Sequence, residues 1–144
     1  MSGELPRSPR DLSADVRHLV VGAGSTMGRG DALISDAVCW NGTLYLSGRA
    51  DVDPATLAVR SDDFEQQARS VLGDVGRVLD EAGSGFADVL RVECYLARAS
   101  DFAAWNTVFG AAFPPPRPAR TTLVADFAVP GLLIELQVTA AVGR

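Results

Sequence analysis

The chain has 144 residues, of which 47% are hydrophobic, and its net charge is −5. This length suits one domain that buries its own core, and the acidic balance with scattered arginines argues against a nucleic-acid partner, which needs clustered cations. The chain contains no lysine, and this excludes a lysine Schiff base and therefore covalent pyridoxal phosphate chemistry.

The N-terminal part of the chain is predicted to carry little regular structure. Residues 1–17 are rich in polar and proline residues and are expected to form a flexible tail, with residues 18–144 forming a single domain. An apolar patch at 19–21 could form an edge strand. The glycine-rich stretch 22–30 lacks the Lys-Ser/Thr ending of a phosphate-binding loop, so it is predicted to be a flexible loop.

A β-hairpin is predicted next. Two β-rich runs, 33–40 and 43–48, flank the dipeptide Asn41-Gly42. Both residues of this dipeptide tolerate the positive φ that a two-residue hairpin turn requires. Residues 51–58 contain a proline and are expected to form a loop.

The middle of the chain predicts a helix and a strand. Residues 62–82 carry apolar side chains at helical spacing, Asp62 and Glu65 form a candidate capping box, and Gly83 is a natural stop. Residues 88–97 alternate as a half-buried strand does. The apolar face of this strand would hold Leu90, Val92, Cys94 and Leu96.

The C-terminal part predicts a second helix and two strands. Ser100 is expected to cap a helix that runs to about Phe113, and the prolines at 114–116 end it. The aromatic residues of this helix share one stripe and are expected to pack in the core: Phe102, Trp105, Phe109 and Phe113. Residues 119–125 and 132–142 are predicted to be the last strands.

The order of the elements indicates the α+β class, because strands and helices mix without regular βαβ alternation. The expected architecture is a mixed β-sheet with both helices on one face. The other face would then be solvated or covered by another subunit, and the apolar composition favours a subunit interface.

Arg120 and Glu135 are the candidate functional residues of the last two strands. A turn at Pro130-Gly131 could let these strands pair as a hairpin and bring a guanidinium and a carboxylate to one pocket. A fixed cation can bind an acidic substrate, and a fixed carboxylate can transfer protons. The alternative is an ordinary cross-strand ion pair, which contributes roughly 0–1 kcal/mol when exposed.

Other classes of site are not predicted. Cys39 and Cys94 lie in apolar runs and are expected to be buried thiols, and His18 is the only histidine, so we expect neither a metal site nor a Ser-His-Asp triad. No apolar run reaches the roughly 18 residues that span a bilayer. No apolar secretion leader is evident, so we expect no membrane association and a cytoplasmic location.

Four stretches of this sequence together resemble the motifs of the RidA/YjgF family of imine deaminases. They are the apolar strand that ends in Ser47-Gly48, the Asp-Pro-Ala-Thr loop at 53–56, the Asp-Phe-x-x-x-Asn helix start at 101–106, and the Pro-Ala-Arg-Thr-Thr run at 118–122 with Glu135 at matching spacing. The resemblance covers residues 33–142. It implies a chorismate-mutase-like fold and a homotrimer with active sites in the clefts between subunits.

The resemblance also implies roles for individual residues. Arg120 would hold the carboxylate of a 2-imino acid by a two-pronged contact, and Glu135 would orient and activate the water that attacks the C=N carbon. The backbone carbonyl of Thr122 would share in orienting this water, and Gly48 would contribute backbone contacts. The products would be a 2-oxo acid and ammonia, with no metal or organic cofactor.

Three residues depart from the family pattern and leave the substrate open. Ile34 stands where many deaminating members have tyrosine, and Asp36 replaces a glutamine. Arg49 replaces a neutral polar residue and adds a second possible anion contact, with an ordinary surface charge as the alternative. Ile34, Gly48 and Arg49 are the residues expected to bind the substrate. The alternatives are therefore an enzyme acting on another imine or enolisable compound, or a non-catalytic trimer that binds small carboxylates.

Overall fold

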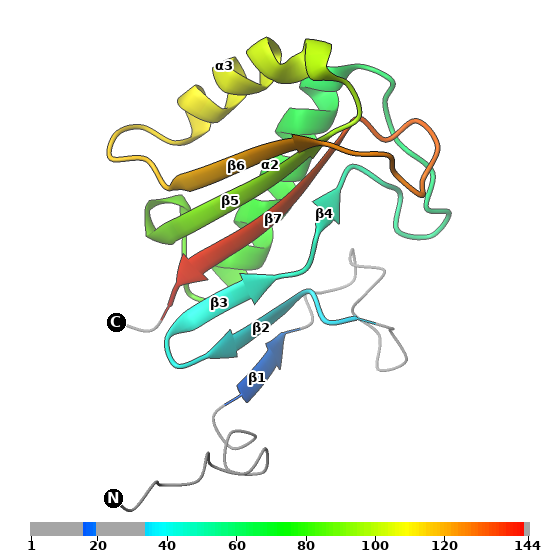
Figure 1. Ribbon diagram of the computed structural model, residues 1–144. Coiled ribbons are helices and arrows are strands. Elements are labelled where there is room, and N and C mark those ends of the chain that lie inside the picture. Colours follow the sequence, from blue (N-terminus) through cyan, green and yellow to red (C-terminus); the bar gives the residue numbers. More distant parts are fainter. Residues whose placement is uncertain (1–15, 20–33, 143–144) are drawn as a thin grey trace, which may run out of the picture.

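The computed structural model describes residues 16–19 and 34–142, which form a β-sheet and two α-helices (Figure 1). The strands are β1 (Val16–Leu19), β2 (Ala37–Trp40), β3 (Thr43–Leu46), β4 (Arg49–Ala50), β5 (Val89–Leu96), β6 (Ala119–Val124) and β7 (Ile134–Ala141). The α-helices are α2 (Phe64–Glu81) and α3 (Phe102–Ala112), and two short 3-10 helices, η2 (Phe86–Asp88) and η3 (Ala99–Asp101), precede β5 and α3. This set of elements confirms the predicted α+β class.

The strand order of the sheet is β1-β2-β3-β7-β5-β6, and β4 also pairs with β7. Strands β5 and β6 are parallel, whereas β7 runs antiparallel to β3, β4 and β5, so the predicted mixed sheet is confirmed. The predicted hairpin between the last two strands is wrong, because β5 lies between β6 and β7. Helix α3 makes the crossover that two parallel strands require.

The predicted hairpin at Asn41-Gly42 is confirmed. Both residues have positive φ, 51° and 75°, and they connect β2 to β3. Strand β1 pairs with β2 and begins at Val16, so the expected domain boundary at residue 18 falls inside this strand. The expectations for 1–15 and for the glycine-rich loop at 22–30 lie outside the described residues.

Helix α2 begins one residue later than its predicted cap. Asp63 is the N-cap, and its Oδ1 accepts the backbone N–H of Gln66 at 2.9 Å. The predicted capping box of Asp62 and Glu65 is therefore wrong, because the helix starts out of register with it. The predicted stop at Gly83 is confirmed by its φ of 77°, a left-handed conformation that glycine adopts without strain.

The pleat of β5 changes direction at its start. Its pairing with β7 shifts between Val89 and Arg91, so Val89 is buried while Leu90 is 51% exposed. The predicted burial of Leu90 is therefore wrong, because an irregularity in the ladder turns the following side chains to the other face. Beyond it, Val92 and Cys94 are buried as predicted.

Helix α3 follows η3, and its N-cap is Asp101, which makes no side-chain capping bond, so the predicted Ser100 cap is wrong. Most of the predicted aromatic stripe is confirmed as core. Trp105, Phe109 and Phe113 are buried and contact one another in order along the helix, edge-to-face in the first pair and tilted in the second, with ring centroids 5.6 and 4.8 Å apart. Phe102, at the start of the stripe, is partly exposed.

Both helices cover the same face of the sheet (Figure 1), and the core lies between them and that face. The buried residues of β5 and β7 point to this side, as do Cys39 and Cys94, which are free buried thiols as expected. The opposite face carries exposed Trp40, Tyr45 and Leu123. None of the helices in the described part of the chain is long and apolar enough to span a membrane.

Candidate active site

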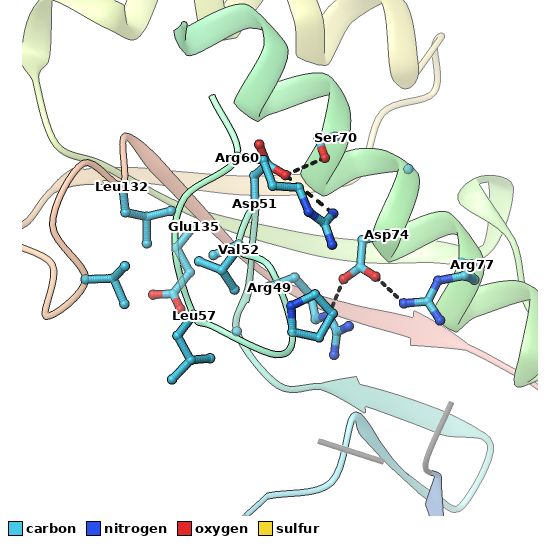
Figure 2. A pocket seen from close by; sticks show the side chains of 15 residues that line it. Arg49, Asp51, Val52, Leu57, Arg60, Ser70, Asp74, Arg77, Leu132 and Glu135 are labelled. Carbon is cyan, nitrogen blue, oxygen red and sulfur yellow. Dashed lines mark hydrogen bonds and ion pairs between the residues drawn. The ribbon is translucent and has the colours of Figure 1, made fainter. Parts of the chain in front are cut away.

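A cavity of about 680 Å³ lies where β4, the loop after it and α2 meet. Figure 2 shows the side chains that line it, and Glu135 from β7 closes one side. Gly48 lines the cavity just before β4, the lining residues from β4 and the loop after it include Arg49, Asp51, Val52, Leu57 and Arg60, and those from α2 include Ser70, Asp74 and Arg77. Two of the three residues expected in the substrate site, Gly48 and Arg49, are therefore in the cavity together with Glu135.

Glu135 occupies a confined position on β7. Its neighbours along the strand, Ile134 and Leu136, point into the core, so strand alternation turns Glu135 to the face without helices. Its carboxylate lies over the Gly48 backbone, because a Cβ at position 48 would be 2.9 Å from Glu135 Oε1. Half-burial raises the pKa of this carboxyl above its usual value.

The start of β7 is fixed by a buried glutamine of α2. The Gln67 side chain donates to the carbonyls of Ser61 and Gly131 at 2.7 and 3.0 Å, and it accepts the N–H of Leu133 at 2.9 Å. A buried amide with all of these bonds made is costly to displace. Gln67 therefore holds the segment that leads into Glu135.

Arg49 is not the open anion contact that the sequence suggested. Its side chain is 8% exposed and lies between two carboxylates: Nη1 is 2.5 Å from Asp36 Oδ1, and Nε is 2.6 Å from Asp74 Oδ2. Asp74 also pairs with Arg77. The guanidinium charge is therefore balanced within the protein, and two departures from the family pattern, Asp36 and Arg49, form an ion pair with each other.

A second polar cluster lines the cavity where the loop after β4 meets α2. Asp51 is buried, and its Oδ1 accepts the Ser70 hydroxyl at 2.7 Å and lies 3.8 Å from Arg60 Nη1. The Arg60 side chain remains about half exposed. This cluster ties the loop to α2 and leaves an arginine at the cavity wall.

Arg120 does not line this cavity. It pairs in register with Val92, which is buried against the helices, so the two side chains share the helix-covered face of the sheet. The guanidinium carbon lies 4.8 Å from the ring centroid of Phe109 and 5.7 Å from that of Phe102. Within the described residues Arg120 makes no ion pair, so these rings hold it without neutralising its charge.

Thr122 and Ile34 also lie apart from the cavity. Thr122 pairs with Cys94 and so shares the face of Arg120, and its buried hydroxyl has no hydrogen-bond partner among the described residues. Burial raises the pKa of the Cys94 thiol to about 12, although the Arg120 charge opposes this. Ile34 is exposed and is not among the cavity residues.

Sequence reasoning missed Leu57, Arg60 and Asp74 as cavity residues. The Asp-Pro-Ala-Thr motif at 53–56 supports the family resemblance, but it does not indicate that the residues after it line a cavity. Asp74 lies on the polar face of α2, where a carboxylate usually faces solvent. Only the packing of α2 beside β4 brings it to Arg49.

The described part of the chain holds no group of three or more histidine, cysteine, aspartate or glutamate residues placed to bind a metal ion. A carboxyl with a raised pKa can accept a proton from water, and an adjacent cavity can hold a small substrate.

Comparison with known proteins shows the family to which this chain belongs. The model of the family described as Endoribonuclease L-PSP matches residues 31–142. A 2-iminobutanoate/2-iminopropanoate deaminase of Capra hircus is 30% identical over 76% of this chain and 80% of its own length. A RutC family protein of Synechocystis is 32% identical, covering 74% and 83% of the two chains.

Solved structures of Rid family proteins have the same fold as this chain. The crystal structure of RidA from the Antarctic bacterium Psychrobacter superposes with a TM-score of 0.75 at 28% identity, covering 88% of this chain and all of that one (100%). YyfA of Yersinia pestis, a member of the Rid family, superposes with a TM-score of 0.76 at 27% identity, covering 86% and 98% of the two chains.

Proposed function

Because the chain belongs to the RidA/YjgF family, we propose that it hydrolyses 2-imino acids to 2-oxo acids and ammonia. The C=N carbon of a protonated imine is electrophilic, so water can add to it. The C–N bond of the adduct then breaks, and the nitrogen leaves as ammonia while the former water oxygen becomes the new carbonyl oxygen. The reaction consumes only water, and positioning supplies much of the acceleration.

The observation that carries this proposal is the unpaired Glu135 carboxylate at the cavity. It makes no ion pair within the described residues, its pKa is raised by burial, and it lies over the Gly48 backbone. A carboxyl of this kind is a stronger base than a solvated one, so it can take a proton from the attacking water and return it to the departing nitrogen.

Arg120 is suited to bind the substrate carboxylate. Its guanidinium presents a fork of N–H donors that matches a carboxylate, and the Phe109 ring fixes its orientation. Thr122 lies two residues farther along the same face, and its unpartnered hydroxyl, with the backbone carbonyl, is available to the water or the substrate.

One chain does not bring these groups to one place, and this supports a site shared between subunits. Arg120 faces the helices and Glu135 faces the open side of the sheet, so a site that uses both takes Arg120 from one subunit and Glu135 from another. The proposed assembly is a homotrimer. The exposed Trp40, Tyr45 and Leu123 on the open face offer apolar surface for such an interface.

The matched family carries a ribonuclease description, but the charges of the cavity favour a small substrate. Each of its arginines lies within 4.0 Å of an aspartate, and the whole chain has a net charge of −5. Binding a phosphate backbone requires several uncompensated cations. An RNA-cleavage assay on the same preparation tests the ribonuclease alternative directly.

The test is ammonia release from 2-iminopropanoate generated in situ, measured above the spontaneous rate. We expect catalysis by the natural protein and its loss in Arg120→Ala, with activity kept in Arg69→Ala, a matched variant on the exposed side of α2. Carboxylate binding without turnover would instead indicate a non-catalytic binding trimer. Turnover of only a different imine or enolisable compound would indicate a redirected enzyme.

A further inference from the structure

Leu57 combines an unfavourable backbone conformation with an exposed apolar side chain. Its φ is 59°, in the left-handed region that costs a residue with a side chain roughly 1–2 kcal/mol, and its apolar side chain is 54% exposed. A glycine at this position would remove both penalties. A residue that is strained and exposed beside a cavity indicates a requirement for the side chain itself.

The loop that carries Leu57 is fixed by its own hydrogen bonds. Asp53 Oδ1 accepts the backbone N–H groups of Ala55 and Thr56 at 2.8 and 3.0 Å. The Leu57 N–H donates to the Asp53 carbonyl at 2.8 Å, and the Asp53 N–H donates to the Ala58 carbonyl at 2.7 Å. The direction of the Leu57 side chain is therefore set by the backbone.

That direction is into the cavity, next to the candidate catalytic carboxylate. Leu57 and Glu135 both line the cavity, and Figure 2 shows the Glu135 side chain among Leu132, Val52 and Leu57. Val129 and Pro54 add to the same lining. One side of the cavity is therefore an aliphatic wall, and Leu57 is the part of it that remains half exposed.

The charges of the cavity point to the same kind of ligand. Arg49 is clamped by two aspartates, Arg77 pairs with Asp74, and Arg60 lies 3.8 Å from Asp51. Each cation of the lining is thus already matched within the chain. An acidic substrate side chain would find no unpaired cation here, whereas an apolar side chain would cover Leu57.

We infer that Leu57 is a specificity-determining residue: it forms the wall against which the side chain of the substrate packs, and it selects 2-imino acids with branched aliphatic side chains over 2-iminopropanoate. This inference rests on the proposed imine hydrolysis and names its substrate class. In a hydrophobic pocket one additional methylene changes discrimination by about tenfold or more, which sets the size of the expected preference.

The test compares the natural protein with Leu57→Gly on two imines, 2-imino-4-methylpentanoate and 2-iminopropanoate, each generated in situ. We expect the natural protein to prefer the branched imine in kcat/KM, and we expect Leu57→Gly to reduce this preference by about tenfold. The same variant should have a higher Tm, because it relieves the left-handed strain. Lower specificity with higher stability is a result that a merely structural role for Leu57 does not produce.

Binding of the stable 2-oxo acid products provides a readout that is independent of turnover. Calorimetric titration with 4-methyl-2-oxopentanoate and with pyruvate should show the same Leu57-dependent preference. The matched control is Leu90→Ala, which removes another exposed leucine outside the cavity and should leave both preferences unchanged.

The outcomes separate the inference from the function on which it rests. If the protein binds the branched 2-oxo acid through Leu57 but hydrolyses neither imine, the proposed hydrolysis is refuted and the role of Leu57 in selecting the ligand side chain stands. Hydrolysis with a preference that Leu57→Gly does not change refutes the inference alone. Dissociation of the assembly by Leu57→Gly, with the preference intact, would make Leu57 a subunit contact and also overturn the inference.

Discussion

Arg120 and Glu135 lie on opposite faces of one sheet, with β5 between the strands that carry them. Arg120 pairs with Val92 and faces the helices, whereas Glu135 pairs with Tyr95 and faces the open side. If both residues act on one substrate, they come from different subunits.

Mixing two inactive variants should restore activity. Arg120→Ala and Glu135→Gln proteins each lack one group at every shared site, so each is expected to be inactive alone. After joint denaturation and refolding, mixed trimers contain sites that combine the intact Arg120 of one subunit with the intact Glu135 of another. Random mixing at equal amounts should recover roughly a quarter of the natural activity. No recovery, in a mixture shown to contain hybrid trimers, would place both residues in the same subunit's site.

The stability of Glu135→Gln relative to the natural protein should depend on pH. Burial raises the folded-state pKa of Glu135 above its unfolded value, so this carboxyl favours folding while protonated, and that contribution is lost as pH rises through the folded pKa. The variant should therefore have the higher Tm at pH 7–8 and lose this advantage below the usual glutamate pKa. Thermal melts at a series of pH values provide the measurement.

The control variant for this experiment should change the stability at neutral pH in the opposite direction. Glu65→Gln removes the carboxylate that pairs with Arg69 at 2.8 Å in the first turn of α2. A negative charge near a helix N-terminus is stabilising, so this variant should be slightly less stable at neutral pH. A Glu135→Gln protein that behaves in the same way would contradict the burial of Glu135.

Removing the charge of Asp36 should destabilise the protein strongly. Asp36 is fully buried and pairs with Arg49, and breaking a buried pair by removing one partner costs about 3–5 kcal/mol. The measurement is the free energy of unfolding in urea at fixed protein concentration for Asp36→Asn. Asp80→Asn makes the same charge change at an exposed site on α2 and should stay within about 0.5 kcal/mol of the natural protein. Equal changes in the free energy of unfolding for the two variants would show that the buried pair of Asp36 and Arg49 does not stabilise the fold.

Gly48→Ala should separate activity from stability. The added Cβ would be 2.9 Å from Glu135 Oε1, and the end of that side chain can move aside at little cost in folding free energy. A displacement of about 1 Å at a reacting group can reduce the rate on the order of a hundredfold. We therefore expect kcat to fall while Tm changes little. Gly85→Ala is the matched control, because its Cβ would have no neighbour closer than 4.0 Å and it lies outside the cavity.

Local signals in the sequence were sufficient for most of the elements. The Asn41-Gly42 turn, the apolar face of α2 and the alternation of β7 each depend on neighbouring residues, and each is present in the structure. The helix starts were placed less well, since Asp62, Asp63 and Ser61 are all acceptable caps and only packing selects one. The exposure of Leu90 does not follow from simple alternation, because the irregularity in the pairing of β5 with β7 arises from contacts between distant segments.

The sequence by itself therefore determined most of the elements, the α+β class and the family, because periodicity, turn residues and short motifs act over a few positions. The tertiary structure decided what the functional residues face. Strand order depends on contacts between distant segments, and the insertion of β5 turned an expected Arg120–Glu135 neighbour pair into groups on opposite faces. In the same way, Asp36 and Asp74 lie 13 and 25 residues from Arg49 along the chain, and only folding converts an apparent anion site into a buried ion pair.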